Sequence, residues 1–281
     1  MDMEERMSPA RKKAWARFLM IALCAVIFVV LVVFAGQLAP YDPLKAFYDH
    51  ILTPPCREFL FGTDQLGRDL FSRILYGGRT SLLIAFLVTA IVSVTGIIIG
   101  AAAGFFGGVF DNILMRFSDM LMAFPGMILT IAMVSFLGTG IPNLVLAMSV
   151  TGWTGYARIT RSLVLSIKNN VYIEQARLGG CPSFNILMRY IIPNVLPSLL
   201  VNIFQDVGGK LLAISGLSLL GLGSAPPTPE WGFMLSEGKN YMYSAPWLLV
   251  FPGLIILINV VIFNLLGDSI QELMNPREDV W

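Results

Sequence analysis

Long apolar runs alternate with short polar stretches along the whole chain. A membrane core about 30 Å thick is crossed by about 20 helical residues, so runs of this length predict transmembrane helices. They lie at 18–34, about 80–104, 120–138, 142–158, 195–222 and 246–267. The pattern predicts an all-α polytopic membrane protein with six transmembrane helices, of which the third and fourth are closely joined.

The first apolar run could instead be the core of a signal peptide, because basic residues between Arg11 and Arg17 precede it. The run from Phe18 to Phe34 has 17 unbroken apolar residues, which is longer than the usual signal core. The Ala-Pro-Tyr-Asp-Pro that follows soon after is a poor cleavage site. We therefore expect an uncleaved first helix.

Six helices place both termini on the same side of the membrane, and the positive-inside rule selects the side. With the N-terminus inside, the inner segments carry twelve Lys and Arg residues and the outer segments carry six. The inner set is Arg6, Arg11, Lys12, Lys13, Arg17, Arg116, Arg158, Arg161, Lys168, Arg177, Arg189 and Arg277, and the outer set is Lys45, Arg57, Arg68, Arg73, Arg79 and Lys239. We expect both termini in the cytoplasm.

These spans divide the chain into five parts. We expect a cytoplasmic tail at 1–17, a first transmembrane helix at 18–36, an external loop at 37–79, a core of five transmembrane helices at 80–267 and a second cytoplasmic tail at 268–281. The external loop should contain an amphipathic interfacial helix within 61–83, closed by Gly77-Gly78.

Composition supports a membrane protein and removes several classes of function. Only 13% of the residues are charged, against about 25% in soluble domains, while 56% are hydrophobic. The net charge of +1 gives no basic stripe for nucleic acid. The single histidine, His50, and three scattered cysteines predict neither a metal site nor a disulfide framework. No phosphate-binding GxxxxGK[ST] motif occurs, so the chain should not hydrolyse ATP.

Residues 169–194 form a polar segment between two apolar runs, on the predicted cytoplasmic side. Asn170 is positioned to cap a short helix that ends at Gly179-Gly180, where glycine can adopt the left-handed conformation. Ser183 is positioned to cap a second helix. In that helix one apolar face is predicted from the spacing of Phe184, Leu187, Met188 and Ile191.

Two interpretations of this segment stay open. It can be an ordered connector with an interfacial helix, or a docking element that a soluble partner grips. The exposed charges expected at Glu174 and Arg177, beside the small Ala176, favour docking in a partner's groove.

The segment resembles the EAA loop of ATP-binding-cassette (ABC) importer permeases. That pattern is Glu-Ala-Ala, three residues, Gly, nine residues and Ile-x-Leu-Pro, and the matching residues here are Glu174, Ala176, Gly180 and Pro193. The departures are Gln175, Tyr190 and Ile192. The resemblance implies that about 166–194 is a coupling loop, with Glu174, Ala176, Arg177, Gly180 and Pro193 coupling the permease to a separate ATPase.

Three more stretches are similar to the dipeptide, oligopeptide and nickel permeases of this family, of the C-type. They are "FGTDQLGRDLFSRILYGGRTSLL" at 61–83, "GFFGGVFDNILMRFSDMLMAFPGMIL" at 104–129, and "LSLLGLGSAPPTPEWGFML" at 217–235 followed by "APWLLVFPG" at 245–253. In the second stretch, glycines should make a tight turn and Pro125 should kink the third span. The likeness runs from about residue 60 to Arg277.

The resemblance implies a type I ABC importer permease fold in a bacterial or archaeal cytoplasmic membrane. It implies a second permease, with a heterodimer expected, two ATPase subunits that bind ATP and Mg²⁺, and an extracytoplasmic solute-binding protein. No cofactor is expected in this chain. Import of di- or oligopeptides is the default, and import of nickel or a metal chelate is the alternative. Ser215 stands where peptide members commonly carry an acidic residue, which leans slightly towards the alternative.

Charged residues interrupt the fifth apolar run. Asp206 and Lys210 lie one helical turn apart, and charges deep in a membrane are presumed functional. They either line the translocation path, with Ser215 as a further candidate, or pair with each other and only stabilise the helix. Near the third run, Asp111, Arg116 and Asp119 are expected to be solvated, with packing at an inner gate as the alternative.

Two other classes of membrane protein, secondary transporters and intramembrane enzymes, have different sequence features. A secondary transporter driven by protons or sodium would need repeated halves with buried ionisable groups. No convincing repeat is visible, and only Asp206 and Lys210 would qualify. An intramembrane enzyme would need a Ser/Lys pair, paired Asp residues or metal ligands within the spans, and none is visible.

Overall fold

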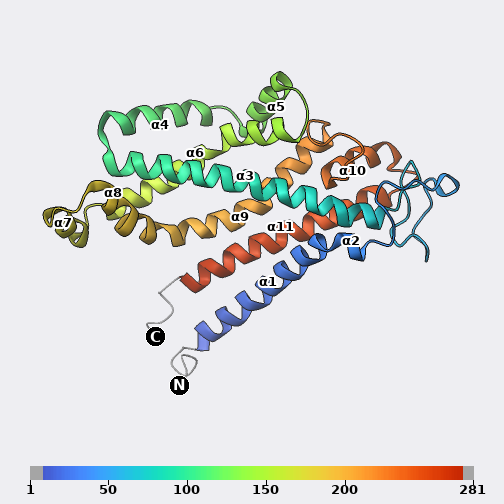
Figure 1. Ribbon diagram of the computed structural model, residues 1–281, viewed down its shortest axis with the longest axis horizontal. Helices are drawn as coiled ribbons and strands as arrows, with labels where there is room; N and C mark the ends of the chain where they lie inside the picture. The colour runs from blue at the N-terminus through green and yellow to red at the C-terminus, as the bar shows by residue number, and fades with distance from the viewer. Residues whose placement is uncertain (1–8, 275–281) are drawn as a thin grey trace.

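The computed structural model describes residues 9–274, which form a bundle of long helices with no β-strand among them (Figure 1). The long helices are α1 (Pro9–Val33), α3 (Leu70–Phe106), α4 (Gly108–Met122), α5 (Gly126–Leu137), α6 (Ile141–Ile167), α9 (Ile192–Leu219) and α11 (Trp247–Met274). The short elements are α2 (Ala35–Leu38), η2 (Tyr48–His50), α7 (Val171–Leu178), α8 (Ser183–Ile186), the π-helical η3 (Leu187–Ile191), α10 (Trp231–Gly238) and η4 (Lys239–Tyr241).

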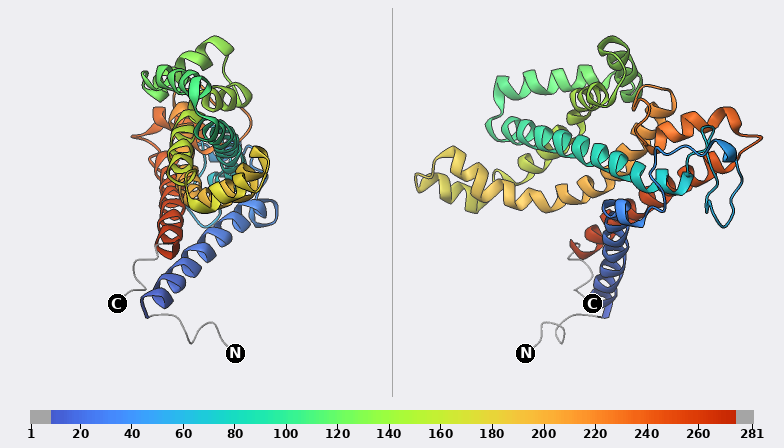
Figure 2. Two further views of the ribbon diagram at one scale, coloured as in Figure 1. Left: turned by 90° about the vertical axis from the view of Figure 1, so that its left-hand side faces the viewer. Right: turned by 45° about the vertical axis from the view of Figure 1, so that its right-hand side comes forward.

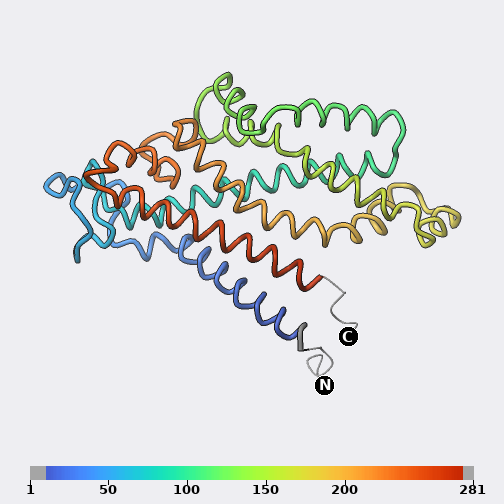
Figure 3. Tube along the Cα trace, turned by 180° about the vertical axis from the view of Figure 1, so that it is seen from behind, coloured from blue at the N-terminus to red at the C-terminus, as the bar shows by residue number. Residues whose placement is uncertain are grey.

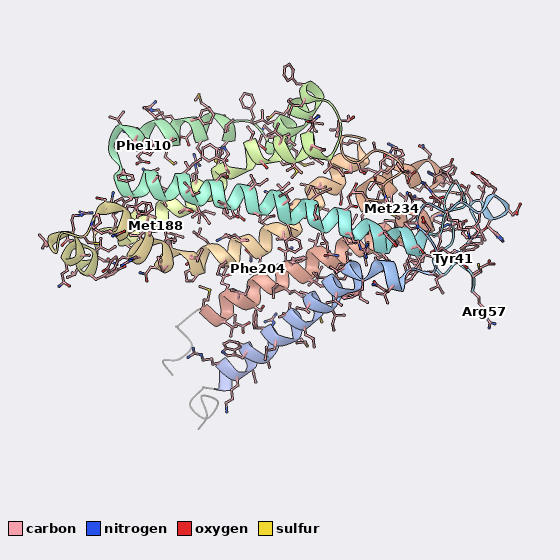
Figure 4. All side chains as sticks on the ribbon, viewed as in Figure 1. Tyr41, Arg57, Phe110, Met188, Phe204 and Met234 are labelled. Atoms are coloured by element: carbon pink, nitrogen blue, oxygen red, sulfur yellow. The ribbon has the colours of Figure 1, made fainter. Side chains whose placement is uncertain are left out.

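The molecule is elongated, with different structures at its two ends (Figures 1 and 2). Helices α7 and α8 lie at one end, which we call the α7 end. The loop at 39–69 and α10 lie at the other, the α10 end. Figure 4 marks the α7 end by Met188 and the α10 end by Tyr41 and Met234, with Phe204 of α9 between them. Helices α3, α6 and α9 run between the two ends, whereas α1 and α11 diverge from them on the way to the chain termini (Figure 1).

Four segments within residues 9–274 are long and apolar enough to cross a membrane: α1, α3, the continuous α8–η3–α9 and α11. Helices α4 and α5 make a fifth if the bent pair counts as one span. Helix α6 is less apolar, and it packs along α3 and is also contacted by α5 and α9. Because these neighbours cover much of α6, it needs a smaller apolar surface than a helix facing lipid. The six-helix prediction stays a prediction.

A row of glycines brings α3 and α6 into close contact. Gly96, Gly100 and Gly104 recur every four residues on α3, as in membrane helices whose backbones approach closely. An added Cβ at Gly96 would lie 2.6 Å from the carbonyl oxygen of Trp153, and one at Gly100 would lie 2.9 Å from Cα of Ala157. Any larger residue at either position would push the two helices apart.

The turn and bend predicted for 104–129 are confirmed. Gly107 and Gly108 have φ angles of 67° and 65°, which suit glycine, and they reverse the chain between α3 and α4. Helices α4 and α5 meet at an angle of 86° across a short break that ends at Pro125.

The predicted helix that closes at Gly77-Gly78 is wrong, because α3 begins at Leu70 and runs on through both glycines. Asp69 caps it, its side chain accepting hydrogen bonds from the Ser72 amide at 2.8 Å and hydroxyl at 2.6 Å. The glycines serve packing instead: an added Cβ at Gly78 would lie 2.7 Å from the Trp231 ring.

A buried polar cluster joins the 39–69 loop to α3 and α10. Arg68 contacts Asp64 at 2.6 Å and Glu237 at 3.0 Å, and Arg73 contacts Glu237 at 2.7 Å. Buried charges are stable only when they are paired and hydrogen-bonded, as these are. The cluster therefore fixes the α10 end of the molecule as one unit.

Candidate functional site: an exposed terminal helix and two central cavities

The predicted helix in 169–194 is confirmed as α7, and so is its glycine stop. The chain leaves α7 through Gly179 and Gly180, and Gly180 has a φ of 78°. The Cys181 amide donates to the carbonyl of Ala176 at 3.0 Å, which satisfies one of the terminal carbonyls. Asn170 occupies the cap position but makes no capping bond with its side chain, so that part of the prediction is wrong.

Helix α7 is anchored by a single buried residue. Ile173 is fully buried in an apolar cluster with Ile186 and Ile191, and the same cluster includes Val164 at the end of α6 and Val195 of α9. Glu174, Gln175 and Arg177 are exposed on the same helix. A force applied to α7 therefore reaches α6 and α9 through packed side chains.

The second predicted helix forms, but its cap is wrong, and its predicted apolar face is confirmed for Leu187 and Ile191 and wrong for Phe184 and Met188. Pro182, not Ser183, stands at the cap position. Ile186, Leu187 and Ile191 are buried, whereas Phe184 and Met188 are 69% and 49% exposed. The apolar cluster around Ile173 takes up Ile186, Leu187 and Ile191, and it leaves Phe184 and Met188 at the surface.

The exposed residues that α7, α8 and η3 carry at the α7 end, where Figure 4 labels Met188, are together called the α7 surface. It consists of the apolar Val171, Leu178, Phe184 and Met188 and the charged Glu174 and Arg177. Of the other predicted coupling residues, Ala176 is half-buried, Gly180 makes the turn and Pro193 is exposed at the start of α9. The roles of all five coupling residues stay predictions.

Ion pairs near the α7 end connect α4 to α6, and sequence reasoning missed them. Two of the three guanidinium nitrogens of Arg161, Nε and Nη2, donate to the carboxylate of Asp111 at 2.5 and 2.6 Å, and Arg158 pairs with Asp119. Asp111 is buried, so the expectation of a solvated charge is wrong for it. A signal was present: the two aspartates lie two turns apart just before the third predicted span, and the two arginines lie one turn apart where the fourth ends.

Asp206 and Lys210 pair with each other in the middle of α9. Lys210 Nζ lies 3.2 Å from Asp206 Oδ1, and the Tyr156 hydroxyl of α6 donates to Asp206 Oδ2 at 3.2 Å. The pairing, which was one of the two alternatives for these residues, is therefore present, and their role in a translocation path stays a prediction.

The same two residues line two adjoining cavities of about 380 and 320 Å³. The larger cavity extends past Tyr156 and Asn202, and the smaller past Thr130, Thr151 and Ala213. The Asp206–Lys210 pair thus belongs to the walls of both.

Ser215 lies elsewhere. It is 3% exposed and packs against α10, where an added Cβ on Gly232 would lie 2.6 Å from the Ser215 carbonyl oxygen. It does not line either of these two cavities. The close approach of the Ser215 backbone explains the glycine at position 232, and a path-lining role for Ser215 stays a prediction.

The chain is similar to known transport proteins over most of its length. Residues 96–280 match the family described as binding-protein-dependent transport system inner membrane component. The glutathione transport system permease protein GsiD of Escherichia coli O6:K15:H31 (strain 536 / UPEC) is 39% identical over 270 residues, covering 94% of this chain and 89% of that protein. The di/tripeptide transport system permease protein DppC of Pseudomonas aeruginosa (strain UCBPP-PA14) is 38% identical over 266 residues, covering 91% and 88%.

A solved structure shares the fold. A chain of the inward-facing MetNI methionine ABC transporter, in its native CY5 crystal form, matches with a TM-score of 0.59. The match covers 73% of this chain and 98% of that one at 17% sequence identity.

Proposed function

Because the chain belongs to the family of binding-protein-dependent transport system inner membrane components, we propose that it is a permease subunit of an ATP-driven importer of short peptides. The observation that carries the proposal is the course of one continuous helical segment, Ser183–Leu219. It begins in the α7 surface, to which it contributes Phe184 and Met188, and it carries Asp206 and Lys210 at the two cavities. One continuous helical segment thus connects a proposed docking surface to a candidate path.

Peptides are favoured as the substrate class by the relatives. One similar permease is named for glutathione and another for di- and tripeptides. These names favour a peptide substrate over nickel or a metal chelate.

The α7 end is the proposed cytoplasmic end of a six-helix, N-in/C-in permease in the inner membrane. Pro9 and Met274, the ends of the described chain, both lie on helices whose terminal ends point towards the α7 side (Figures 1 and 3). This direction agrees with the positive-inside count, which places both termini and α7 together.

The proposed mechanism is mechanical. Two ATPase subunits, which bind ATP and Mg²⁺, engage the α7 surface of this chain and the equivalent surface of a second permease. Their closure on ATP moves α7, and the cluster around Ile173 carries that motion into α6 and α9. The walls of the two cavities then shift, opening the path towards the solute-binding protein on the outer side. The chain itself contributes motion and a pathway rather than catalysis.

Affinity purification of the tagged chain from its native membrane, followed by mass spectrometry, tests the assembly. We expect two cassette ATPases and a second permease to copurify. In liposomes that contain this complex and its binding protein, uptake of labelled glutathione or a dipeptide should require ATP hydrolysis. A chain that transports without any ATPase, in response to a proton or sodium gradient, would replace the importer with the secondary-transporter hypothesis.

A further inference from the structure

The Asp206–Lys210 pair leaves hydrogen-bonding capacity directed at the cavities. An ammonium group has three donors and a carboxylate about four acceptor positions. Lys210 makes one ion pair, with Asp206, and Asp206 also accepts from Tyr156. The two side chains keep 19% and 26% of their surface exposed. They are therefore accessible to a solute in either cavity.

Two glycines that line the larger cavity, Gly155 and Gly209, have no packing reason to be glycine. An added Cβ at Gly155 would meet nothing within 4 Å, and one at Gly209 would meet only Asp206 Oδ1, at 3.8 Å. This contrasts with Gly96 and Gly100, where α6 leaves no room for a side chain. The absence of side chains at Gly155 and Gly209 keeps space open at the charged pair.

Helix stabilisation alone is a weak explanation of the pair. A pair of opposite charges one turn apart stabilises a helix only slightly. Placing a single charge at the centre of a membrane helix costs several times more than such a pair returns. Two charges lining open space are better explained by a ligand than by the stability they add.

We propose that Asp206 and Lys210 form a binding site for a zwitterionic solute, with Lys210 receiving its free carboxylate and Asp206 its free ammonium group. This inference rests on the proposed function and specifies which groups of a short peptide the path recognises. The solute's own two charges replace the contacts of the protein pair, so no charge is left unpaired in a region of low dielectric constant. A solute with one terminus blocked leaves either Asp206 or Lys210 without its new partner.

The first test compares uptake of three solutes by the complete complex in liposomes: Ala-Ala, Ala-Ala-amide and N-acetyl-Ala-Ala. Each variant's rate is divided by the wild-type rate for the same solute, so the preference of the binding protein cancels. We expect Lys210→Met to lower Ala-Ala uptake at least tenfold and Ala-Ala-amide uptake less than threefold. Asp206→Asn should show the corresponding pattern with the N-acetylated peptide. Equal losses for all three solutes would overturn the inference.

The matched control is Asp268→Asn, which removes an acidic group from α11 that accepts a hydrogen bond from Gln205 of α9 at 2.8 Å. Asp268 lines neither of the two cavities. This variant should change uptake of the three solutes equally. Selective loss with Asp268→Asn would contradict the assignment to Asp206 and Lys210.

A second measurement does not depend on delivery by the binding protein. Ala213, one turn beyond Lys210, lines the smaller cavity, and the Ala213→Cys variant places a thiol there. Its modification by an uncharged maleimide is followed by mass spectrometry in the ATP-free complex. Millimolar Ala-Ala should slow labelling at least twofold, the two blocked peptides should not, and Lys210→Met should remove the protection. Equal labelling with all three peptides would overturn the inference.

The experiments distinguish failure of the proposed function from failure of the zwitterion site. If the wild-type complex does not assemble, or imports nothing on ATP hydrolysis, the proposed function fails. If it imports dipeptides but Lys210→Met and Asp206→Asn show no dependence on the termini, only the zwitterion site fails.

Discussion

Arg161 of α6 holds the carboxylate of Asp111 in the first turn of α4 with two parallel hydrogen bonds of 2.5 and 2.6 Å. The Asp111 side chain is 10% exposed and that of Arg161 33% exposed. This pair fixes how α4 leaves the glycine turn at Gly107-Gly108, and hence how the bent α4–α5 segment lies along α6.

Replacing Asp111 by Ala should lower thermal stability measurably. The change leaves the Arg161 guanidinium without its bidentate partner, and a hydrogen bond to a charged group contributes about 1.5–3 kcal/mol. Because Arg161 is partly exposed and screened, we expect a loss near the lower end of that range. Thermal unfolding of the purified complex in detergent measures it.

The neighbouring pair of Arg158 and Asp119 supplies the control for this prediction. Their side chains are 48% and 55% exposed, and exposed pairs contribute about 0–1 kcal/mol. Asp119→Ala should therefore change the melting temperature little. A larger loss from Asp119→Ala than from Asp111→Ala would contradict the importance given to burial here.

A side chain at Gly100 should separate α3 from α6. Gly100→Val introduces atoms where Ala157 Cα lies 2.9 Å from the position of Cβ, and backbone atoms cannot yield cheaply. We expect a destabilisation of about 1–3 kcal/mol or more and poor assembly of the complex. Gly253 of α11 is the matched control, because an added Cβ there meets nothing within 4 Å. Gly253→Val should fold and assemble normally.

The sequence was sufficient to predict the elements whose signals are local. Apolar runs predicted the long spans, glycine at 107–108 and 180 predicted two turns, and Pro125 predicted the bend. The spacing of Asp206 and Lys210 indicated their pairing as one of two alternatives. Each of these features depends on the length of an apolar run, on the backbone conformation of one or two residues, or on the spacing within one helical turn. Residues close in the sequence determine all three.

The errors arose where distant residues decide the structure. Gly77-Gly78 reads as a helix stop, but Trp231, far away in the sequence, packs over it and its indole N–H donates to the Ile74 carbonyl at 2.8 Å. The α-helical repeat groups Phe184 and Met188 with Leu187 and Ile191, but packing against α6, α7 and α9 buries only the latter two, together with Ile186.

Glu230 should make stability depend on pH. It is fully buried at the start of α10 and accepts from the amides of Gly232 and Phe233, both at 2.8 Å. Burial raises the pKa of this carboxyl above its ordinary value, although the two amides oppose the rise. A raised pKa means that the protonated form favours folding. This contribution is complete below the unfolded-state pKa, about 4.3, and is lost as the pH rises through the higher folded-state pKa.

Comparison with Glu230→Gln isolates that dependence, because Gln stays neutral at every pH. We expect the melting temperature of the variant minus that of the wild type to increase as the pH is raised from about 4, and then to become constant. The loss of one capping bond adds an offset that does not vary with pH. A difference that is flat, or that falls with rising pH, would be inconsistent with a raised pKa.

Glu174→Lys should abolish coupling without unfolding the protein. Glu174 is exposed on α7, and none of the described residues forms an ion pair with it. Reversing the charge of this side chain should therefore leave the melting temperature nearly unchanged. If α7 docks on an ATPase, the new positive charge alters the docking surface directly, and we expect ATP-driven uptake to fall at least tenfold. Recovery of the ATPases with the tagged variant should fall in parallel. Glu272→Lys makes the same charge change at an exposed carboxylate of α11, whose pair with Arg17 at 3.4 Å is weak, and should retain uptake. Normal uptake by a stable Glu174→Lys complex would remove Glu174 from the coupling mechanism, because a reversed charge on a docking surface cannot leave docking unchanged.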